Sequence, residues 1–67
     1  MKGYGRFQHG RGAEYFYRPV EQTAGALIEA LAVLPPDTLI ETTAGYDGVT
    51  ELAGVWYYPA TKTASLG

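Results

Sequence analysis

The residues best suited to chemistry are basic and aromatic side chains, most of them near the N-terminus. They are Arg6, His9, Arg11, Tyr15, Tyr17 and Arg18, joined later in the chain by Trp56 and Tyr57. Guanidinium groups bind phosphate through paired hydrogen bonds and stack on bases, and tyrosine rings offer flat surfaces to nucleobases. The pattern predicts a ligand-binding site in which the arginines neutralise phosphates and the aromatic rings stack on the ligand or line a pocket.

Catalytic, metal-binding and cofactor-binding patterns are missing from the sequence. There is no cysteine, the single histidine is His9, and the single serine, Ser65, lies two residues from the end of the sequence. The acidic residues lack the spacing of a calcium loop, and GYGRFQHGRG lacks the glycine spacing of a dinucleotide-binding loop. We therefore expect no enzyme, no metal and no cofactor. His9, between Gln8 and Gly10, is typical of an exposed turn residue, with anion contact as the alternative.

The charges are unevenly distributed along the chain. Residues 1–18 carry four basic side chains and Glu14, a net charge of +3, whereas residues 19–67 carry Lys62 and six acidic side chains, a net charge of −5. This asymmetry indicates an anion-binding arm or self-association through opposite charges. The pI near 5.1 disfavours a nucleic acid as the main partner, because the acidic remainder would repel a polyanion.

These side chains must be positioned by a small α+β domain. Residues 1–12, rich in glycine and aromatic side chains, are expected to be a flexible arm or a strand with a tight turn, and residues 13–67 a single domain. AEYFYR, residues 13–18, predicts a strand with Tyr15 and Tyr17 on one face and Phe16 on the other.

A helix should follow, from about Val20 to Leu34, where apolar residues recur at helical spacing. Thr23 is the N-cap if the helix is shorter, and Pro35 disfavours helical geometry at Leu34. Strands are predicted over 37–43 and 50–58, with a turn or short loop at 44–48 between them. A turn at 59–62 and a short edge strand at 63–66 complete the chain.

The expected fold is one helix packed on a small antiparallel sheet, in the order β-α-β-β-(β). A single helix covers only one face, so aromatic residues should be exposed on the other and form a surface for a partner or ligand. A chain of 67 residues buries only about 60% of its unfolded surface, which favours a homo-oligomer. No apolar run is long enough to span a membrane and no signal peptide is evident, so a cytoplasmic protein is expected.

The stretch LIEALAVLPPDTLIETTAGYDGV resembles a loose group of small uncharacterised proteins from tailed phages, prophages and bacteria. In that group an amphipathic helix ends in Leu-Pro-Pro-Asp, enters a strand, and is followed by a Gly-Tyr-Asp/Glu-Gly turn. The matching positions are Leu31, Leu34, Pro35, Pro36, Asp37, Gly45, Tyr46, Asp47 and Gly48. The resemblance implies a phage-type accessory protein and brings no established activity; the basic, aromatic N-terminal segment departs from the pattern.

Together these observations predict a non-enzymatic binding protein that acts by occupancy as a homo-oligomer. It would sequester a small anionic ligand such as a nucleotide signal, or block a host protein, as phage counter-defence proteins of this size do. One alternative is a nucleic-acid-binding module that uses residues 1–18 as a basic arm. Another is a structural subunit whose aromatic face is buried in a larger assembly.

Overall fold

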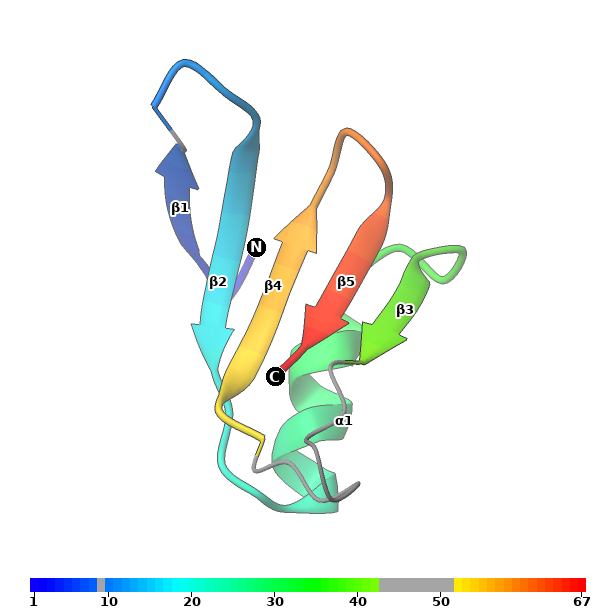
Figure 1. The fold of residues 1–67 in the computed structure, drawn as a ribbon. Helices are drawn as coiled ribbons and strands as arrows, with labels where there is room; N and C mark the ends of the chain where they lie inside the picture. The colour runs from blue at the N-terminus through cyan, green and yellow to red at the C-terminus, as the bar shows by residue number, and fades with distance from the viewer. Residues whose placement is uncertain (9, 43–51) are drawn as a thin grey trace.

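The computed structural model describes residues 1–8, 10–42 and 52–67 and has an α+β fold, which confirms the expected class. The described residues form a single helix and a five-stranded sheet, with strand order β1-β2-β4-β5-β3 (Figure 1). The elements are β1 (Gly5–Gln8), β2 (Glu14–Pro19), α1 (Ala24–Ala32), β3 (Leu39–Thr42), β4 (Gly54–Tyr58) and β5 (Thr63–Leu66).

The sheet is mixed, so the prediction of an antiparallel sheet was wrong for one strand. β3 pairs with β5 in parallel, Leu39 opposite Thr63 and Thr42 opposite Leu66. The predicted edge position of residues 63–66 was also wrong, since β5 lies between β4 and β3. The turn at residues 59–62 makes β4 and β5 antiparallel. β3 pairs with the other edge of β5 and runs in the same direction as β5.

The N-terminal segment contributes a strand, which adds one element at the start of the expected order. β1 pairs antiparallel with β2, with Gly5 opposite Tyr17 and Phe7 opposite Tyr15. Just before β1, the Tyr4 hydroxyl donates a 2.7 Å hydrogen bond to the carbonyl of Ala30 in α1. The segment is therefore held both by the sheet and by the helix.

The helix is shorter than the predicted 20–34 and begins after Thr23, the alternative N-cap. The Thr23 hydroxyl accepts a 3.2 Å hydrogen bond from the Ala26 N–H, which satisfies one of the free donors of the first turn. Val33 is the C-cap, and the Leu34 N–H donates to the Leu31 carbonyl at 3.0 Å. The helix ends before Pro35, as the steric restriction on Leu34 requires.

The predicted turn at 59–62 is confirmed. The N–H groups of Thr61 and Lys62 donate to the carbonyls of Tyr58 and Pro59, each at 3.3 Å, and Lys62 has a φ of 52°. β3 and β4 begin later than predicted, at Leu39 and Gly54. Residues 43, 50 and 51 and the predicted turn or short loop at 44–48 lie outside the described residues.

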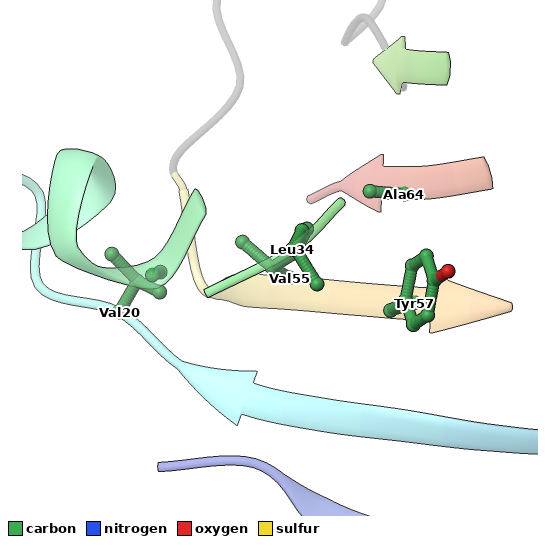
Figure 2. Packing of buried hydrophobic residues seen from close by; sticks show 6 residues of the cluster. Val20, Leu34, Val55, Tyr57 and Ala64 are labelled. Atoms are coloured by element: carbon green, nitrogen blue, oxygen red, sulfur yellow. The ribbon is translucent and has the colours of Figure 1, made fainter. Parts of the chain in front are cut away.

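The core lies between α1 and the adjacent face of the sheet (Figure 2). Its buried members in the described part of the chain are Val20, Ala30, Leu34, Val55, Tyr57 and Ala64. Val55 is the largest side chain there that is completely buried. With so small a core, stability depends on the partly buried side chains around it, including Tyr4, Phe16 and Leu27.

Candidate functional site

The face of the sheet opposite α1 carries a row of aromatic side chains from three neighbouring strands. Side chains alternate along a strand, and residues directly opposite on paired strands share a face. Val55 and Tyr57 face the core, so their neighbours on β4 point the other way. The registers of β1, β2 and β4 place five rings there, and we call them the aromatic face: Phe7, Tyr15, Tyr17, Trp56 and Tyr58.

These rings contact one another across the strands. Phe7 stacks on Tyr15 with ring centroids 5.5 Å apart and planes 19° apart, and Tyr15 lies 6.0 Å from Tyr58. The Tyr17 and Trp56 rings are closer, with centroids at 4.6 Å and an interplanar angle of 43°. Such separations are typical of favourable aromatic pairs, so the rings support each other's orientation.

A glycine makes room for this packing. A Cβ atom on Gly54 would lie 2.6 Å from the Arg18 carbonyl oxygen and 2.6 Å from Cε1 of Tyr17. Gly54 is opposite Pro19 in the β2·β4 register, diagonal to Tyr17. The Tyr17 ring therefore occupies the space that a side chain at position 54 would fill.

Beside the rings lies a hollow of about 310 Å³, lined by Gly12, Ala13, Tyr15, Trp56 and Tyr58. Small-molecule pockets span roughly 300–1,000 Å³, which places this hollow at the small end of the range. Its walls are three aromatic rings, and its remaining edge is the backbone of two small residues that precede β2. This shape suits a planar ring system of modest size.

Two of the predicted arginines lie on the other side of the sheet. Arg18 is opposite Val55, and Arg6 is opposite Phe16, so both project on the face that α1 covers. Arg6 binds Glu14, with Nη2 2.6 Å from Oε2 and Nε donating to the same oxygen at 2.8 Å. Their charges are therefore separated from the aromatic face by the thickness of the sheet.

Arg18 instead supports the anchoring of Tyr4. Its guanidinium carbon lies 6.0 Å from the centre of the Tyr4 ring, and Nη1 donates to the Lys2 carbonyl at 3.3 Å. Burial raises the pKa of the Tyr4 hydroxyl, and the positive charge of Arg18 partly opposes this. This keeps the Tyr4 phenol neutral, so its hydroxyl can donate the hydrogen bond to the Ala30 carbonyl.

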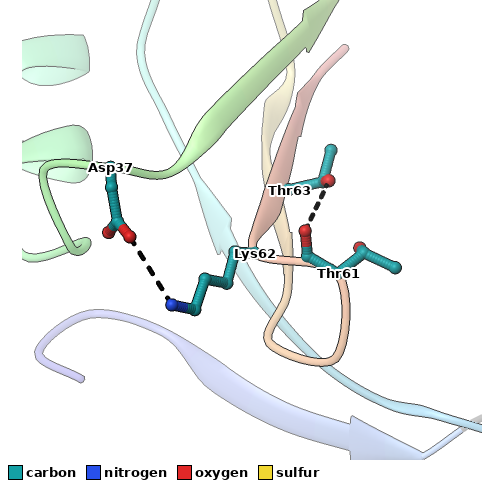
Figure 3. A network of polar contacts seen from close by, with 4 residues as sticks. All are labelled: Asp37, Thr61, Lys62 and Thr63. Atoms are coloured by element: carbon teal, nitrogen blue, oxygen red, sulfur yellow. Dashed lines mark hydrogen bonds and ion pairs between the residues drawn. The ribbon is translucent and has the colours of Figure 1, made fainter.

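Lys62 and Arg11 differ in whether they form an ion pair. Nζ of Lys62 lies 3.5 Å from Oδ2 of Asp37, at the start of β5 (Figure 3). Arg11 is exposed and forms no ion pair with any described residue. It directly precedes Gly12, which lines the hollow. Arg11 is thus the arginine best placed to meet a charged group on a ligand in the hollow.

The structure brings together only some of the predicted site residues. Tyr15, Tyr17 and Trp56 share the aromatic face, and Arg11 directly precedes Gly12, which lines the hollow. Tyr57 is not among them, because it alternates with Trp56 and is 6% exposed in the core. His9 lies outside the described residues.

Four residues of the aromatic face or of the hollow were not among the predicted site residues. Phe7 and Tyr58 are 45% and 37% exposed, and strand alternation already places Tyr58 on the same face as Trp56. Phe7 becomes part of the face only through the β1·β2 register. Gly12 and Ala13 line the hollow with backbone and small side chains, and no residue pattern signals such a role.

Within residues 1–8, 10–42 and 52–67, no three histidine, cysteine or acidic side chains gather closely enough to hold a metal ion. In the same ranges no helix has the length and hydropathy needed to cross a bilayer.

Comparison of the chain with protein-family models, curated proteins and solved structures finds no match. The aromatic face and its hollow must therefore be interpreted from their own geometry.

Proposed function

We propose that this protein is a non-enzymatic binding protein that captures a small planar ligand on its aromatic face. The observation that carries the proposal is the hollow of about 310 Å³ walled by Tyr15, Trp56 and Tyr58. A nucleobase placed against these rings would stack at each contact, and stacking of a base on an aromatic side chain is worth about 1–3 kcal/mol.

Arg11 favours a ligand that carries one anionic group next to its ring, such as a mononucleotide. It is the exposed arginine adjacent to the hollow and has no ion-pair partner among the described residues. Arg6 and Arg18 are engaged on the opposite face. A ligand with many charges would meet few compensating cations here, so the site suits stacking supplemented by a single charge contact.

In this proposal the protein acts by occupancy, as a homo-oligomer and an accessory protein of phage type. Sequestering a nucleotide signal would be a counter-defence activity, and blocking a host protein through the same aromatic face would be a second form of it. The helix-LPPD-strand pattern of residues 27–42 supports the phage setting. The aromatic lining of the hollow supports capture of a ring-bearing ligand.

The single tryptophan provides the test. Trp56 lines the hollow and is the chain's only tryptophan, so its fluorescence reports directly on occupancy. We expect AMP to quench the emission saturably, adenosine to do so more weakly, and ribose 5-phosphate to leave it unchanged. Equal quenching by ribose 5-phosphate and AMP, or no saturable quenching by either AMP or GMP, would contradict capture of a nucleobase.

Two arginine variants form a matched pair for the charge contact. Arg11→Gln should weaken AMP binding about two- to fivefold and leave adenosine binding unchanged, whereas Arg6→Gln should affect neither. Tyr58→Ala should weaken both ligands, because it removes one wall of the hollow. If Arg6→Gln and Arg11→Gln weaken AMP binding equally, the charge contact is not at the hollow.

A single-stranded nucleic acid is the second candidate. Rings on three adjacent strands form a platform on which successive bases can stack. The position of Arg6 and Arg18 on the opposite face argues against it, because backbone phosphates along the platform would lack cations. Oligothymidine affinity that exceeds AMP affinity and falls steeply with salt would favour this candidate.

A further inference from the structure

We propose that β3 is the subunit interface of a symmetric dimer, in which two copies of Leu39–Thr42 pair antiparallel and extend the sheet across both chains. The inference rests on the homo-oligomeric part of the proposed function and names the surface that would form it. It is independent of the ligand, since the aromatic face involves β1, β2 and β4, and β5 separates these strands from β3 (Figure 1).

β3 pairs on one side only within the described part of the chain. It is last in the strand order, next to β5. The Leu39 N–H donates to the Lys62 carbonyl at 2.8 Å, which directs the backbone groups of Leu39 toward β5. Because backbone groups alternate in direction along a strand, Ile40 and Thr42 direct theirs to the edge that no described strand covers.

This edge lacks the lysine and proline that commonly prevent strand pairing, and Glu41 is the one charged residue of β3. Edge strands are commonly protected by lysine, proline or inward-pointing charge. β3 contains no lysine or proline, and its two large apolar side chains, Leu39 and Ile40, are 65% and 50% exposed.

One register fits the side chains of β3 best. A two-fold axis at Ile40 makes this residue a hydrogen-bonded pair with its own copy, through the backbone groups that face outward. Leu39 then lies opposite Glu41 of the second copy, and Thr38 opposite Thr42. Moving the axis to Glu41 would place two carboxylates directly opposite each other, which is destabilising.

A second copy of this chain is the partner that best fits the β3 edge. The same residues serve both sides of the two-fold axis, so each exposed Ile40 is covered by its counterpart. The described chain buries only six hydrophobic residues well, and small domains of this kind commonly gain stability by association. Pairing at β3 adds backbone hydrogen bonds and apolar contacts without altering the existing core.

The first experiment measures mass in solution by light scattering across a concentration series. The wild type should have twice the 7.2 kDa mass of one chain, and Ile40→Lys should have the mass of one chain. Ile28→Lys is the matched control, because Ile28 is also exposed, at 66%, but lies on α1. It should leave the dimer intact. Circular dichroism of each variant checks that the fold is retained.

The second experiment tests the register with introduced cysteines, since the chain has none of its own. In the proposed register the two Cα atoms at position 40 lie about 5.5 Å apart, within the range that a disulfide spans. Those at position 39 lie roughly 8 Å apart, outside it. Ile40→Cys should therefore form a covalent dimer on mild oxidation in high yield, and Leu39→Cys in a yield at least fivefold lower.

The outcomes separate this inference from the ligand proposal. A wild type that is monomeric at every concentration, or an Ile40→Lys variant that remains dimeric, would overturn the β3 interface whatever AMP does. Equal cross-linking at positions 39 and 40 would overturn the register. Loss of AMP quenching with the dimer intact would overturn only the ligand proposal.

Discussion

Tyr17 and Trp56 form the closest ring pair on the aromatic face, with centroids 4.6 Å apart, although they come from strands on either side of the helix in sequence. They are directly opposite in the β2·β4 register. The pair therefore joins the N-terminal hairpin to the C-terminal one. Trp56 also lines the hollow, so the contact that stabilises the sheet orients a wall of the candidate site.

Replacing Tyr17 with alanine should lower the free energy of unfolding by about 2 kcal/mol, because it removes the ring contact and part of the apolar cover of Trp56. The Trp56 emission should shift to longer wavelength as water reaches the indole. Urea unfolding monitored by circular dichroism gives the first quantity, and fluorescence gives the second. Phe7→Ala is the control: Phe7 lies outside this pair, so the emission maximum should stay unchanged.

Gly54→Ala should lower the free energy of unfolding by about 1–3 kcal/mol. The added methyl group would lie 2.6 Å from the Arg18 carbonyl oxygen and 2.6 Å from the Tyr17 ring. The ring is the more mobile neighbour, so we also expect it to move and the Trp56 emission to change. Urea unfolding checks the stability, and an alanine variant as stable as the wild type would show that β2 and β4 are less closely packed than described.

Gly25→Ala should have the opposite effect and raise the free energy of unfolding by up to about 1 kcal/mol. A Cβ atom there meets nothing within 4 Å, and Gly25 is the second residue of α1. A domain of this size should then melt several degrees higher. Thr23→Ala is the companion variant, expected to lower stability by about 1 kcal/mol through loss of the N-cap. A stable Thr23→Ala variant would place the helix start elsewhere.

Tyr4→Phe should lower the free energy of unfolding by about 1 kcal/mol at pH 7, because the hydrogen bond to the Ala30 carbonyl is lost. Burial raises the pKa of Tyr4 above its ordinary value of 10.0, which means that the folded state favours the neutral phenol. Its contribution is complete below pH 10 and is lost as the pH rises through the folded-state pKa.

Thermal unfolding between pH 8 and 12 measures this dependence. The wild type should lose stability above pH 10 more steeply than Tyr4→Phe. Tyr58→Phe removes a hydroxyl from the aromatic face and keeps the Tyr4 hydrogen bond, so it should decline like the wild type. Identical declines in the wild type and Tyr4→Phe would mean that Tyr4 is not the group responsible.

Local patterns in the sequence were enough to predict the fold class and most of its elements. Two-residue alternation separated Tyr15 and Tyr17 from Phe16, and the Thr23 cap and Pro35 marked the ends of the helix region. The partner of β3 was not predictable in the same way. Its parallel pairing with β5 depends on contacts between residues far apart in sequence, which no local pattern encodes.

The candidate site was predicted only in part, for a related reason. Alternation along β4 already places Trp56 and Tyr57 on opposite faces, and alternation along β2 separates Arg18 from Tyr17. Their basic and aromatic character suggested that these residues form one site, whereas the sheet places them on opposite faces. The position of Arg6 required the β1·β2 register, and the hollow beside Gly12 required the three-dimensional arrangement of one loop and two strands.

The order of strands in the sheet also has a consequence for how the chain reaches its native state. Only residues 9–13 separate β1 from β2, and only residues 59–62 separate β4 from β5, so each pair closes with a small loss of chain entropy. The β2·β4 pairing must instead close a loop that contains the helix and β3. Folding should therefore be limited by the meeting of two preformed hairpins, an encounter that brings Tyr17 to Trp56.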